Sequence, residues 1–367
     1  MSKPLVVFIG GGESSEHEIS IRSLYSVFNN FQSKIWRKAI VIIDKRGYWF
    51  FAYQFNDLLE KRKKQYFLKK NKKEEIVLIK RGGKTVIYSL ERNKILDNVG
   101  MVFPLTHGTF GEDGSLQGYL ELLNVPYVGA NVLSSALGMD KEFFKKILKE
   151  AKIPVIPSLT LNYTDTSKER REKIEQAITK FGFPLFVKPA SLGSSIGVSK
   201  VFEKPSLKWA INKAFDYDNK VLLEKFIKGR EVECAVLGNE NPRSSLVGEI
   251  QPQEEFYSYS AKYLNPAGAK LLAPTNLSCQ TVKKIQKIAL EVYRALGVTG
   301  MARVDFFLQA NGRVITSEIN TIPGFTEISM YPKLWQASGL PYPKLLEKLV
   351  SLALETYKAK KRLRRSY

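Results

Sequence analysis

The stretch Gly300-Met-Ala-Arg-Val-Asp-Phe-Phe-Leu-Gln-Ala-Asn-Gly-Arg-Val-Ile-Thr-Ser-Glu-Ile-Asn320 has the pattern of a β-hairpin. Two runs rich in β-branched and aromatic residues flank Asn311-Gly312, the pair that best tolerates a type I′ turn. If these two residues form the turn, Ala310 pairs with Arg313 and the rest of the register follows by counting back. One face of this hairpin then suits a hydrophobic core, with Val304, Phe306, Leu308, Ile315 and Ile319.

The opposite face of the predicted hairpin is polar. The same register places Asp305 opposite Glu318 and Arg303 opposite Asn320, and the period of two along a strand puts all four on one side. Two carboxylates facing each other across a pair of strands repel, so a cation is expected between them. Carboxylate and amide oxygens suit Mg²⁺ or Mn²⁺, usually shared with substrate phosphates. The alternative is that Arg303 alone neutralises the carboxylates in a surface network.

The length and composition describe an ordinary globular protein. A chain of 367 residues predicts two or three domains. No apolar run reaches the ~18 residues of a membrane span, so we expect a cytoplasmic protein without a membrane partner. Cys234 and Cys279 are the only cysteines, which excludes a disulfide framework. The net charge of +21 is partly clustered, in a basic insertion near 45–95 and in the C-terminal tail, but no nucleic-acid-binding motif accompanies it.

The N-terminal third contains two loops that follow short apolar runs. Residues 4–9 predict a strand, which leads through three glycines to Glu16 and a helix. Glu16 suits an ammonium group, although capping of the helix is equally compatible with the pattern. A strand over 99–105 leads to His107, and such loops at the carboxyl ends of strands line the ligand crevice of open α/β sheets. A structural role for His107 is the alternative.

The middle of the chain contains a pattern typical of nucleotide binding. A helix is predicted from Lys141 to Ala151, and a strand ending in Lys188 runs into a Gly/Ser loop whose backbone N–H groups suit phosphate. A further strand ends at Glu224, where neighbouring apolar residues and the carboxylate suit an adenine ring. Residues 254–268 form a polar, Tyr-rich loop that is expected to act as a lid.

These segments together resemble the ATP-grasp superfamily, and within it the D-alanine–D-alanine ligase family. The resemblance extends from about residue 6 to residue 349. Nine motifs occur in family order: Gly11-Gly12-x-Ser-Ser-Glu16-x-Glu-Ile-Ser20, His107-Gly-x-x-Gly-Glu-Asp-Gly114, Met139-Asp-Lys141, Val187-Lys-Pro189, Gly193-Ser-Ser-x-Gly197, Glu224-Lys225, Lys262-Tyr263, Arg303-x-Asp305 and Glu318-x-Asn320-Thr-x-Pro-Gly324.

The resemblance implies a fold and a set of site residues. The fold is α/β: a Rossmann-like N-terminal domain with the insertion (1–135), a central α+β ATP-grasp subdomain (136–230), a C-terminal α/β ATP-grasp subdomain (231–352) and a basic tail (353–367). The implied metal ligands, for two ions of Mg²⁺ or Mn²⁺, are Asp305, Glu318 and Asn320. The implied ATP-binding residues are Lys141, Lys188, Ser195, Glu224, Lys225, Phe226, Ile227 and Glu231.

The remaining implied positions concern the amino acid substrates. Glu16, Ser194 and Tyr263 correspond to a set that orients the first D-alanine, and Arg303 and Gly324 to groups that stabilise the tetrahedral intermediate. Further substrate contacts are His107, Lys262, Ser329 and Met330. The resemblance implies ATP-dependent formation of D-alanyl-D-alanine for peptidoglycan precursors, by a homodimer. The alternatives are a D-alanine–D-lactate or D-alanine–D-serine ligase, or a non-catalytic protein that binds nucleotide or nucleic acid.

Overall fold

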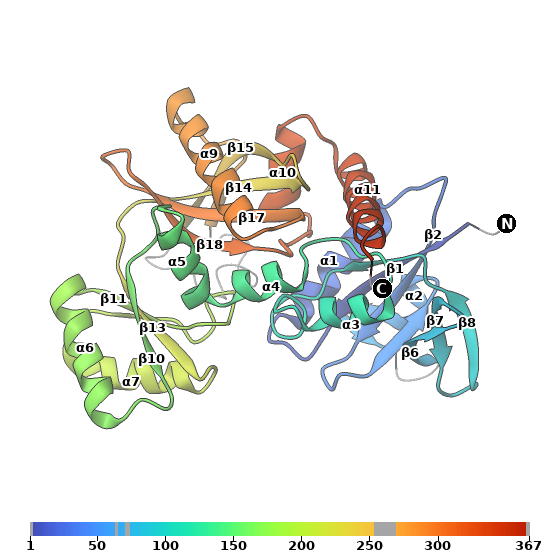
Figure 1. Ribbon diagram of the computed structural model, residues 1–367, viewed down its shortest axis with the longest axis horizontal. Coiled ribbons are helices and arrows are strands. Elements are labelled where there is room, and N and C mark those ends of the chain that lie inside the picture. Colours follow the sequence, from blue (N-terminus) through green and yellow to red (C-terminus); the bar gives the residue numbers. More distant parts are fainter. Residues whose placement is uncertain (1–2, 63–64, 70–73, 253–268, 365–367) are drawn as a thin grey trace.

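Three separate β-sheets organise the chain in a computed structural model that describes residues 3–62, 65–69, 74–252 and 269–364 (Figure 1). A sheet of seven strands belongs to the N-terminal part, one of four strands to the middle, and one of five strands to the C-terminal part; a two-stranded hairpin accompanies the first. Within the described residues no helix is long and apolar enough to cross a bilayer. This arrangement confirms the predicted α/β class with three parts.

The N-terminal sheet is built around β1, which is completely buried. Its neighbours β2 and β9 both run parallel to it, as expected of strand–helix units. The side chains of β1 pack on two hydrophobic clusters, one on each face of the sheet. Outside the basic insertion, the elements of this part are β1 (Leu5–Gly11), α1 (His17–Asn30), β2 (Arg37–Ile43), β9 (Met101–Pro104), α3 (Ser115–Leu123) and α4 (Val132–Met139).

The basic insertion extends the N-terminal sheet and is part of its fold. Strands β3, β6, β7 and β8 add to the edge of β2 in that order, all antiparallel. A hairpin about Gly82 and Gly83 joins β6 to β7, and both glycines have positive φ, as a tight two-residue turn requires. The elements here are β3 (Trp49–Ala52), α2 (Phe55–Leu58), β4 (Leu59–Arg62), β5 (Gln65–Leu68), β6 (Glu74–Arg81), β7 (Lys84–Ser89) and β8 (Lys94–Asn98).

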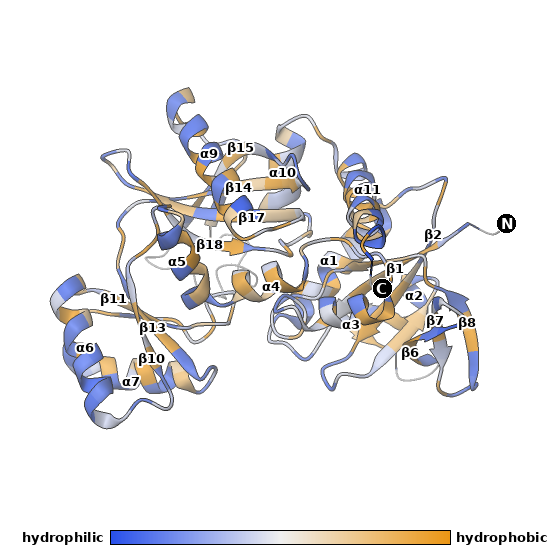
Figure 2. Cartoon of the chain, viewed as in Figure 1, coloured by the Kyte–Doolittle hydropathy of each residue, from blue (hydrophilic) through white to orange (hydrophobic). Residues whose placement is uncertain are grey.

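The central sheet is small and antiparallel, in the order β10-β13-β11-β12. Helices α6 and α7 pack on it, and α6 is polar over most of its length, with Ala177 as its buried residue (Figure 2). The elements are α5 (Lys141–Glu150), β10 (Ser158–Asn162), α6 (Ser167–Phe181), β11 (Leu185–Pro189), β12 (Ser199–Val201), α7 (Lys204–Phe215) and β13 (Lys220–Lys225).

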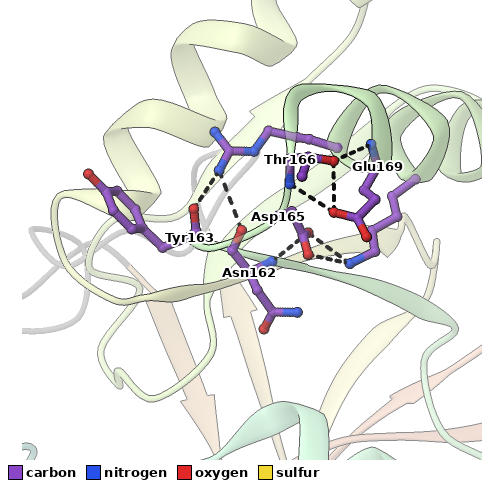
Figure 3. Close-up of polar contacts among 7 residues, drawn as sticks. Asn162, Tyr163, Asp165, Thr166 and Glu169 are labelled. Carbon is purple, nitrogen blue, oxygen red and sulfur yellow. Dashed lines mark hydrogen bonds and ion pairs between the residues drawn. The ribbon is translucent and has the colours of Figure 1, made fainter.

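A capping box fixes the start of α6 (Figure 3). The Thr166 side chain accepts from the backbone N–H of Glu169 at 3.3 Å, and the Glu169 carboxylate accepts from the backbone N–H of Thr166 at 2.8 Å. Asp165 accepts from the backbone N–H of Asn162 and from the ammonium of Lys173. The turn between β10 and α6 is therefore held by side chains on both sides.

The C-terminal sheet has the order β16-β15-β14-β17-β18, with every neighbouring pair antiparallel. One face packs against α9 and α5 in a hydrophobic cluster, and α10 lies on the other face (Figure 1). The elements are β14 (Arg230–Gly238), β15 (Arg243–Pro252), β16 (Ala269–Leu272), α9 (Cys279–Ala295), β17 (Gly300–Leu308), β18 (Val314–Asn320), α10 (Met330–Ala337) and α11 (Tyr342–Lys361).

The hairpin β17–β18 has the expected strands but a different turn. The predicted type I′ turn is wrong: Leu308 pairs with Val314, and the backbone N–H of Gly312 bonds to the carbonyl of Gln309 at 2.9 Å. Of the turn residues only Gly312 has positive φ, which fits a type I turn followed by a bulge at glycine. The turn therefore shifts the pairing by one residue relative to the prediction.

A second irregularity restores the predicted register further along. The ladder slips between Asp305 and Phe306, so that Ser317 is an extra residue on β18. Beyond this bulge Asp305 does face Glu318. Between the turn and this bulge, the residues of β18 face the opposite way from the prediction. Val314 faces the core, whereas Ile315, which we expected in the core, pairs with Phe307 on the face that carries the site.

Helix α11 runs back onto the N-terminal part (Figure 1). It continues to Lys361, so residues 353–361, expected to belong to a basic tail, are helical. The ammonium of Lys360 pairs with Glu121, and the Tyr357 hydroxyl donates to the carbonyl of Asn124 at 3.1 Å. Its buried leucines, together with α1 and α10, form one continuous cluster that joins the N-terminal and C-terminal parts.

Candidate active site

A cavity of about 190 Å³ lies where the three parts of the chain meet. It is lined by the loop before α1, the loop after β9, the Gly/Ser loop after β11, strands β14, β17 and β18, and the segment that follows β18. The predicted site residues that line it are Glu16, His107, Ser194, Glu231, Arg303, Asp305, Glu318, Asn320, Gly324, Ser329 and Met330.

Glu16 occupies the N-terminal wall of the cavity. It precedes the first residue of α1, but its side chain makes no capping bond; the hydroxyl of Ser14 instead accepts from the backbone N–H of Glu16 at 3.1 Å. Its carboxylate accepts a hydrogen bond from the hydroxyl of Ser194, which belongs to the central part. A Cβ at Gly108 would lie 2.7 Å from Glu16 Oε2, so only glycine fits the backbone there. Glu16 is 6% exposed and faces the cavity.

His107 links two loops of the cavity. Its Nε2 lies 3.0 Å from the hydroxyl of Ser23, which in turn accepts from the backbone N–H of Phe325 at 3.3 Å. Burial lowers the pKa of His107 to about 4, so the imidazole is neutral at physiological pH. The two interpretations of His107 are thus compatible, because the ring both lines the cavity and holds the neighbouring loops together.

Glu112 was not among the predicted site residues, although it lies in the motif from His107 to Gly114. Its Oε2 accepts from the backbone N–H of Gly108 at 2.7 Å, and the residue lines the cavity. Burial, followed by the nearby Glu16 carboxylate, raises the pKa of Glu112 to about 8. Close to neutral pH the two acidic residues therefore share fewer than two negative charges.

The raised pKa of Glu112 predicts a pH dependence of stability. A carboxyl whose pKa is higher in the folded state stabilises the fold below about pH 4.5, and this contribution is lost as the pH rises through about 8. Between about pH 4.5 and 8, the unfolding free energy of Glu112→Gln should therefore fall less than that of the wild-type protein. We expect the difference to exceed ~1.4 kcal/mol, the equivalent of one pKa unit. Urea denaturation at a series of pH values checks this; parallel curves for the two proteins would contradict it.

The polar face of the hairpin β17–β18 forms the C-terminal wall. The Arg303 guanidinium binds Asp305 through two hydrogen bonds of 2.7 Å, and Asn320 Nδ2 donates to Asp305 Oδ2 at 3.0 Å. Asp305, together with Glu233 and Glu318, raises the pKa of Arg303 well above its usual range, although burial acts in the opposite direction. Arg303 thus does pair with a carboxylate of the hairpin, as the alternative interpretation expected, but the pair lies inside a cavity and not at the surface.

The same face can hold a divalent cation. Asp305 and Glu318 are opposite each other, and with Asn320 they offer three oxygen donors of the hard type that Mg²⁺ and Mn²⁺ prefer. Within residues 3–62, 65–69, 74–252 and 269–364, no three His, Cys, Asp or Glu side chains gather as a preformed cage. A site of two carboxylates and an amide fits an ion that shares its coordination with substrate phosphates.

The predicted nucleotide-binding residues of the central part lie around a buried ion network. Both oxygens of Glu224 are engaged, by Lys188 Nζ at 2.5 Å and by Lys145 Nζ at 2.9 Å. Burial alone would raise the pKa of Glu224, but the two ammonium groups lower it to about 2. Lys145, which was not predicted, is 1% exposed and also donates to the carbonyl of Ile156 at 3.1 Å.

Apolar residues lie beside this network. Ile227 and Ile315 form a small cluster with Ile156, against which Phe307 packs. The Phe226 ring is 6.1 Å from that of Phe186. The other predicted residues here are Lys141, whose Nζ donates to the carbonyl of Leu192 at 2.5 Å, Ser195, which has positive φ, and Lys225, which is exposed.

The loop carrying Gly324 and Ser329 closes the cavity. The hydroxyl of Ser329 accepts from the backbone N–H of Thr326 at 2.9 Å. A Cβ at Gly324 would lie 2.8 Å from the same hydroxyl, so a larger residue there would displace the Ser329 side chain from this position. The two remaining predicted site residues, Lys262 and Tyr263, and the predicted lid at 254–268 lie outside the described residues.

Comparisons with known proteins identify the family of this chain. The family model for the N-terminus of D-ala D-ala ligases matches residues 5–130, and the model for the C-terminus matches residues 147–351. The chain is 43% identical to a D-alanine–D-alanine ligase of Shouchella clausii over 366 residues, which covers 100% of this chain and 99% of the relative.

Solved structures give the same result. The D-alanine–D-alanine ligase of Coxiella burnetii superposes with a TM-score of 0.84 at 38% identity, covering 99% of this chain and 97% of that one. The VanG D-Ala:D-Ser ligase of Enterococcus faecalis gives a TM-score of 0.82 at 33% identity, covering 96% and 100%. This chain therefore has the ATP-grasp fold and belongs to the D-alanine–D-alanine ligase family.

Proposed function

We propose that this enzyme joins two molecules of D-alanine in an ATP-dependent ligation that passes through an acyl phosphate and releases ADP and phosphate. The observation that carries this proposal is the meeting of three functions in one cavity: an acidic receptor at Glu16, a guanidinium at Arg303 and the opposed carboxylates of the hairpin. Full-length membership of the ligase family supports it.

The first amino acid would bind between the N-terminal and C-terminal walls. Glu16 receives its ammonium group, and Ser194 holds the Glu16 carboxylate in place. The carboxylate of the substrate then points toward Arg303 and attacks the γ-phosphate of ATP. Positioning of this kind, with charge stabilisation by Lys188 and Arg303, supplies most of the rate enhancement in phosphoryl transfer.

The second amino acid would bind near the loop that closes the cavity. Ser329, Met330 and His107, which all line the cavity, would contact it. Its amine displaces phosphate from the acyl group, and Arg303 and the backbone N–H of Gly324 stabilise the charge that develops on the tetrahedral carbon's oxygen. We also propose that Lys262 and Tyr263 contribute to this step, as the family resemblance implies.

ATP would lie between the central and C-terminal sheets. We propose that the cations Lys141 and Lys188 and the backbone at Ser195 contact its phosphates, and that the apolar cluster receives the adenine. Mg²⁺ or Mn²⁺, two ions in our proposal, would be held by Asp305, Glu318 and Asn320 and would neutralise charge on the phosphates. The remaining proposed nucleotide contacts are Glu224, Lys225, Phe226, Ile227 and Glu231.

Ser194→Ala tests the assignment of the first substrate site. The change removes one hydrogen bond from Glu16, so we expect the KM for D-alanine in the first half-reaction to rise about tenfold, ~1.4 kcal/mol. The KM for ATP should change less than twofold. Steady-state kinetics with both substrates varied check this. Equal increases in both constants would instead point to a general disturbance of the Gly/Ser loop.

The decisive test of the function is ATP-dependent phosphate release with a panel of D-amino and D-hydroxy acids, followed by mass analysis of the product. D-alanyl-D-alanine should dominate when D-alanine is the only amino acid. When D-alanine is offered together with D-serine or D-lactate, a product that preferentially contains the competing acid would establish the corresponding alternative. D-serine is the closer competitor because the VanG D-Ala:D-Ser ligase shares the fold at 33% identity.

The cellular setting is a further part of the proposal. We propose that the protein is a cytoplasmic homodimer that supplies D-alanyl-D-alanine for peptidoglycan precursors. The domain division that we propose remains 1–135, 136–230 and 231–352, although α4, β14 and α11 run across these limits. Nothing in this function requires a nucleic acid or a membrane.

A further inference from the structure

A third carboxylate lies beside the proposed metal ligands. Glu233 on β14 pairs with Asp305 on β17, which in turn pairs with Glu318 on β18, so three adjacent strands present a row of acidic side chains on one face. Glu233 is 3% exposed and lines the cavity. Burying a third carboxylate here is costly unless a cation accompanies it.

Arg303 lies between two of these carboxylates. Its guanidinium makes the two hydrogen bonds of 2.7 Å to Asp305, and its Nε is also 3.2 Å from Glu233 Oε2. A planar guanidinium with five N–H donors can bind one carboxylate in two places and still contact another. Arg303 thus has two acidic partners, of which it fully engages only Asp305.

This arrangement conflicts with metal binding at Asp305 unless the arginine moves. Both oxygens of Asp305 accept from Arg303, and one also accepts from Asn320. A divalent cation on Asp305 would lie close to the positive guanidinium, and the two would repel each other. The arginine must therefore release Asp305 while remaining in the cavity, where the reaction needs it.

We propose that Glu233 is a positioning residue that takes over Arg303 from Asp305 when the divalent cation binds. This inference rests on the proposed function, because it assumes that Asp305 is a metal ligand. The charges agree with it: three carboxylates, those of Glu233, Asp305 and Glu318, face one guanidinium on this face of the sheet, and divalent cations can offset the excess of negative charge. In the metal-bound state Arg303 is then held by Glu233, with donors facing the reacting groups.

The test is the affinity of the full-length protein for Mn²⁺ in the presence of ADP, measured by electron paramagnetic resonance without turnover. In Glu233→Gln the arginine has no second carboxylate and competes with the metal for Asp305. We expect the Kd for Mn²⁺ to rise at least tenfold. Glu233→Asp keeps the charge with a shorter reach and should give a smaller increase, which also provides a result if the glutamine variant does not fold.

Glu249→Gln is the matched control. Glu249 is also 3% exposed and binds an arginine, Arg230, at 2.8 and 2.6 Å, but it lies on the neighbouring strand and its pairing with Val232 places it on the opposite face of the sheet. Glu249→Gln should leave the Kd for Mn²⁺ within twofold of the wild-type value. A tenfold increase in this control would show that any buried charge matters, and would overturn the proposal.

A double-mutant cycle separates action through Arg303 from direct attraction of the metal. In an Arg303→Met background no guanidinium competes with the metal for Asp305, so adding Glu233→Gln should change the Kd less than threefold. An undiminished effect would overturn the proposal. The wild-type protein should bind Mn²⁺ at a saturable site that Glu318→Gln removes, and the metal assignment itself fails if it does not. If that site is present but Glu233→Gln leaves its Kd unchanged, only the role of Glu233 is refuted.

Discussion

Replacing Glu318 with glutamine is expected to lower turnover by roughly 10²–10³-fold while the protein stays folded. Glu318 faces Asp305 across the hairpin and lines the cavity, so the change removes one of the two opposed carboxylates without altering its size. The loss of repulsion between strands should leave the unfolding free energy unchanged or slightly higher. Phosphate release at saturating substrates, together with thermal unfolding, measures both quantities.

Glu327→Gln provides the matched control for this experiment. Glu327 is an exposed carboxylate on the loop beside the cavity, and its removal should leave turnover within twofold. Near-normal activity of Glu318→Gln at millimolar Mg²⁺ would remove Glu318 from the metal site. An unfolded variant would instead show that the row of carboxylates is needed for the fold, as in a purely structural ion network.

The hairpin shows how far local sequence rules reach. Strand pattern and an Asn-Gly pair correctly indicated two strands with Asp305 facing Glu318. The same pair, however, is compatible with both a type I′ turn and a type I turn with a bulge at Gly312, because glycine suits either position. The bulge at Ser317 has no signature of its own, and it compensates for the error in the turn. As a result, the exchange of Val314 and Ile315 was not predictable.

The site residues that were missed differ in how they could have been found. Glu233 follows Glu231 by two residues on a strand, so period-two alternation alone would place both on the site face. Lys145 follows Lys141 by four residues on α5, a spacing that places both on one side of a helix. Their partners come from other elements, however, and no local pattern shows that Lys145 meets Glu224.

The convergence of the three parts was accessible only through the family resemblance. Glu16 and Ser194 are 178 residues apart, yet they share a hydrogen bond across the cavity. Composition and periodicity describe each segment but contain no information on how the sheets dock. The helical end of α11 is an example: we expected a separate basic tail over residues 353–367, whereas Tyr357 and Lys360 contact the N-terminal part.

Glu224→Gln is expected to destabilise the fold by ~3–5 kcal/mol at neutral pH, because it leaves two ammonium groups without their counterion. Glu224 is 2% exposed, and Lys145 is 1% exposed, so solvent cannot replace the lost carboxylate. The pKa of about 2 adds a signature. A carboxyl with a lowered pKa contributes stability above about pH 4.5 that is lost as the pH falls toward 2, so the variant should lack this acid-dependent loss.

The double variant Glu224→Gln/Lys145→Met decides whether the cause is the unpaired charge. Removing the buried ammonium together with its partner leaves one lysine, Lys188, which is 18% exposed and can be hydrated. We therefore expect the double variant to recover at least half of the lost unfolding free energy, as measured by urea denaturation at pH 7. A double variant less stable than Glu224→Gln alone would mean that Lys145 stabilises the fold mainly through its bond to the carbonyl of Ile156, and the charge argument would be wrong.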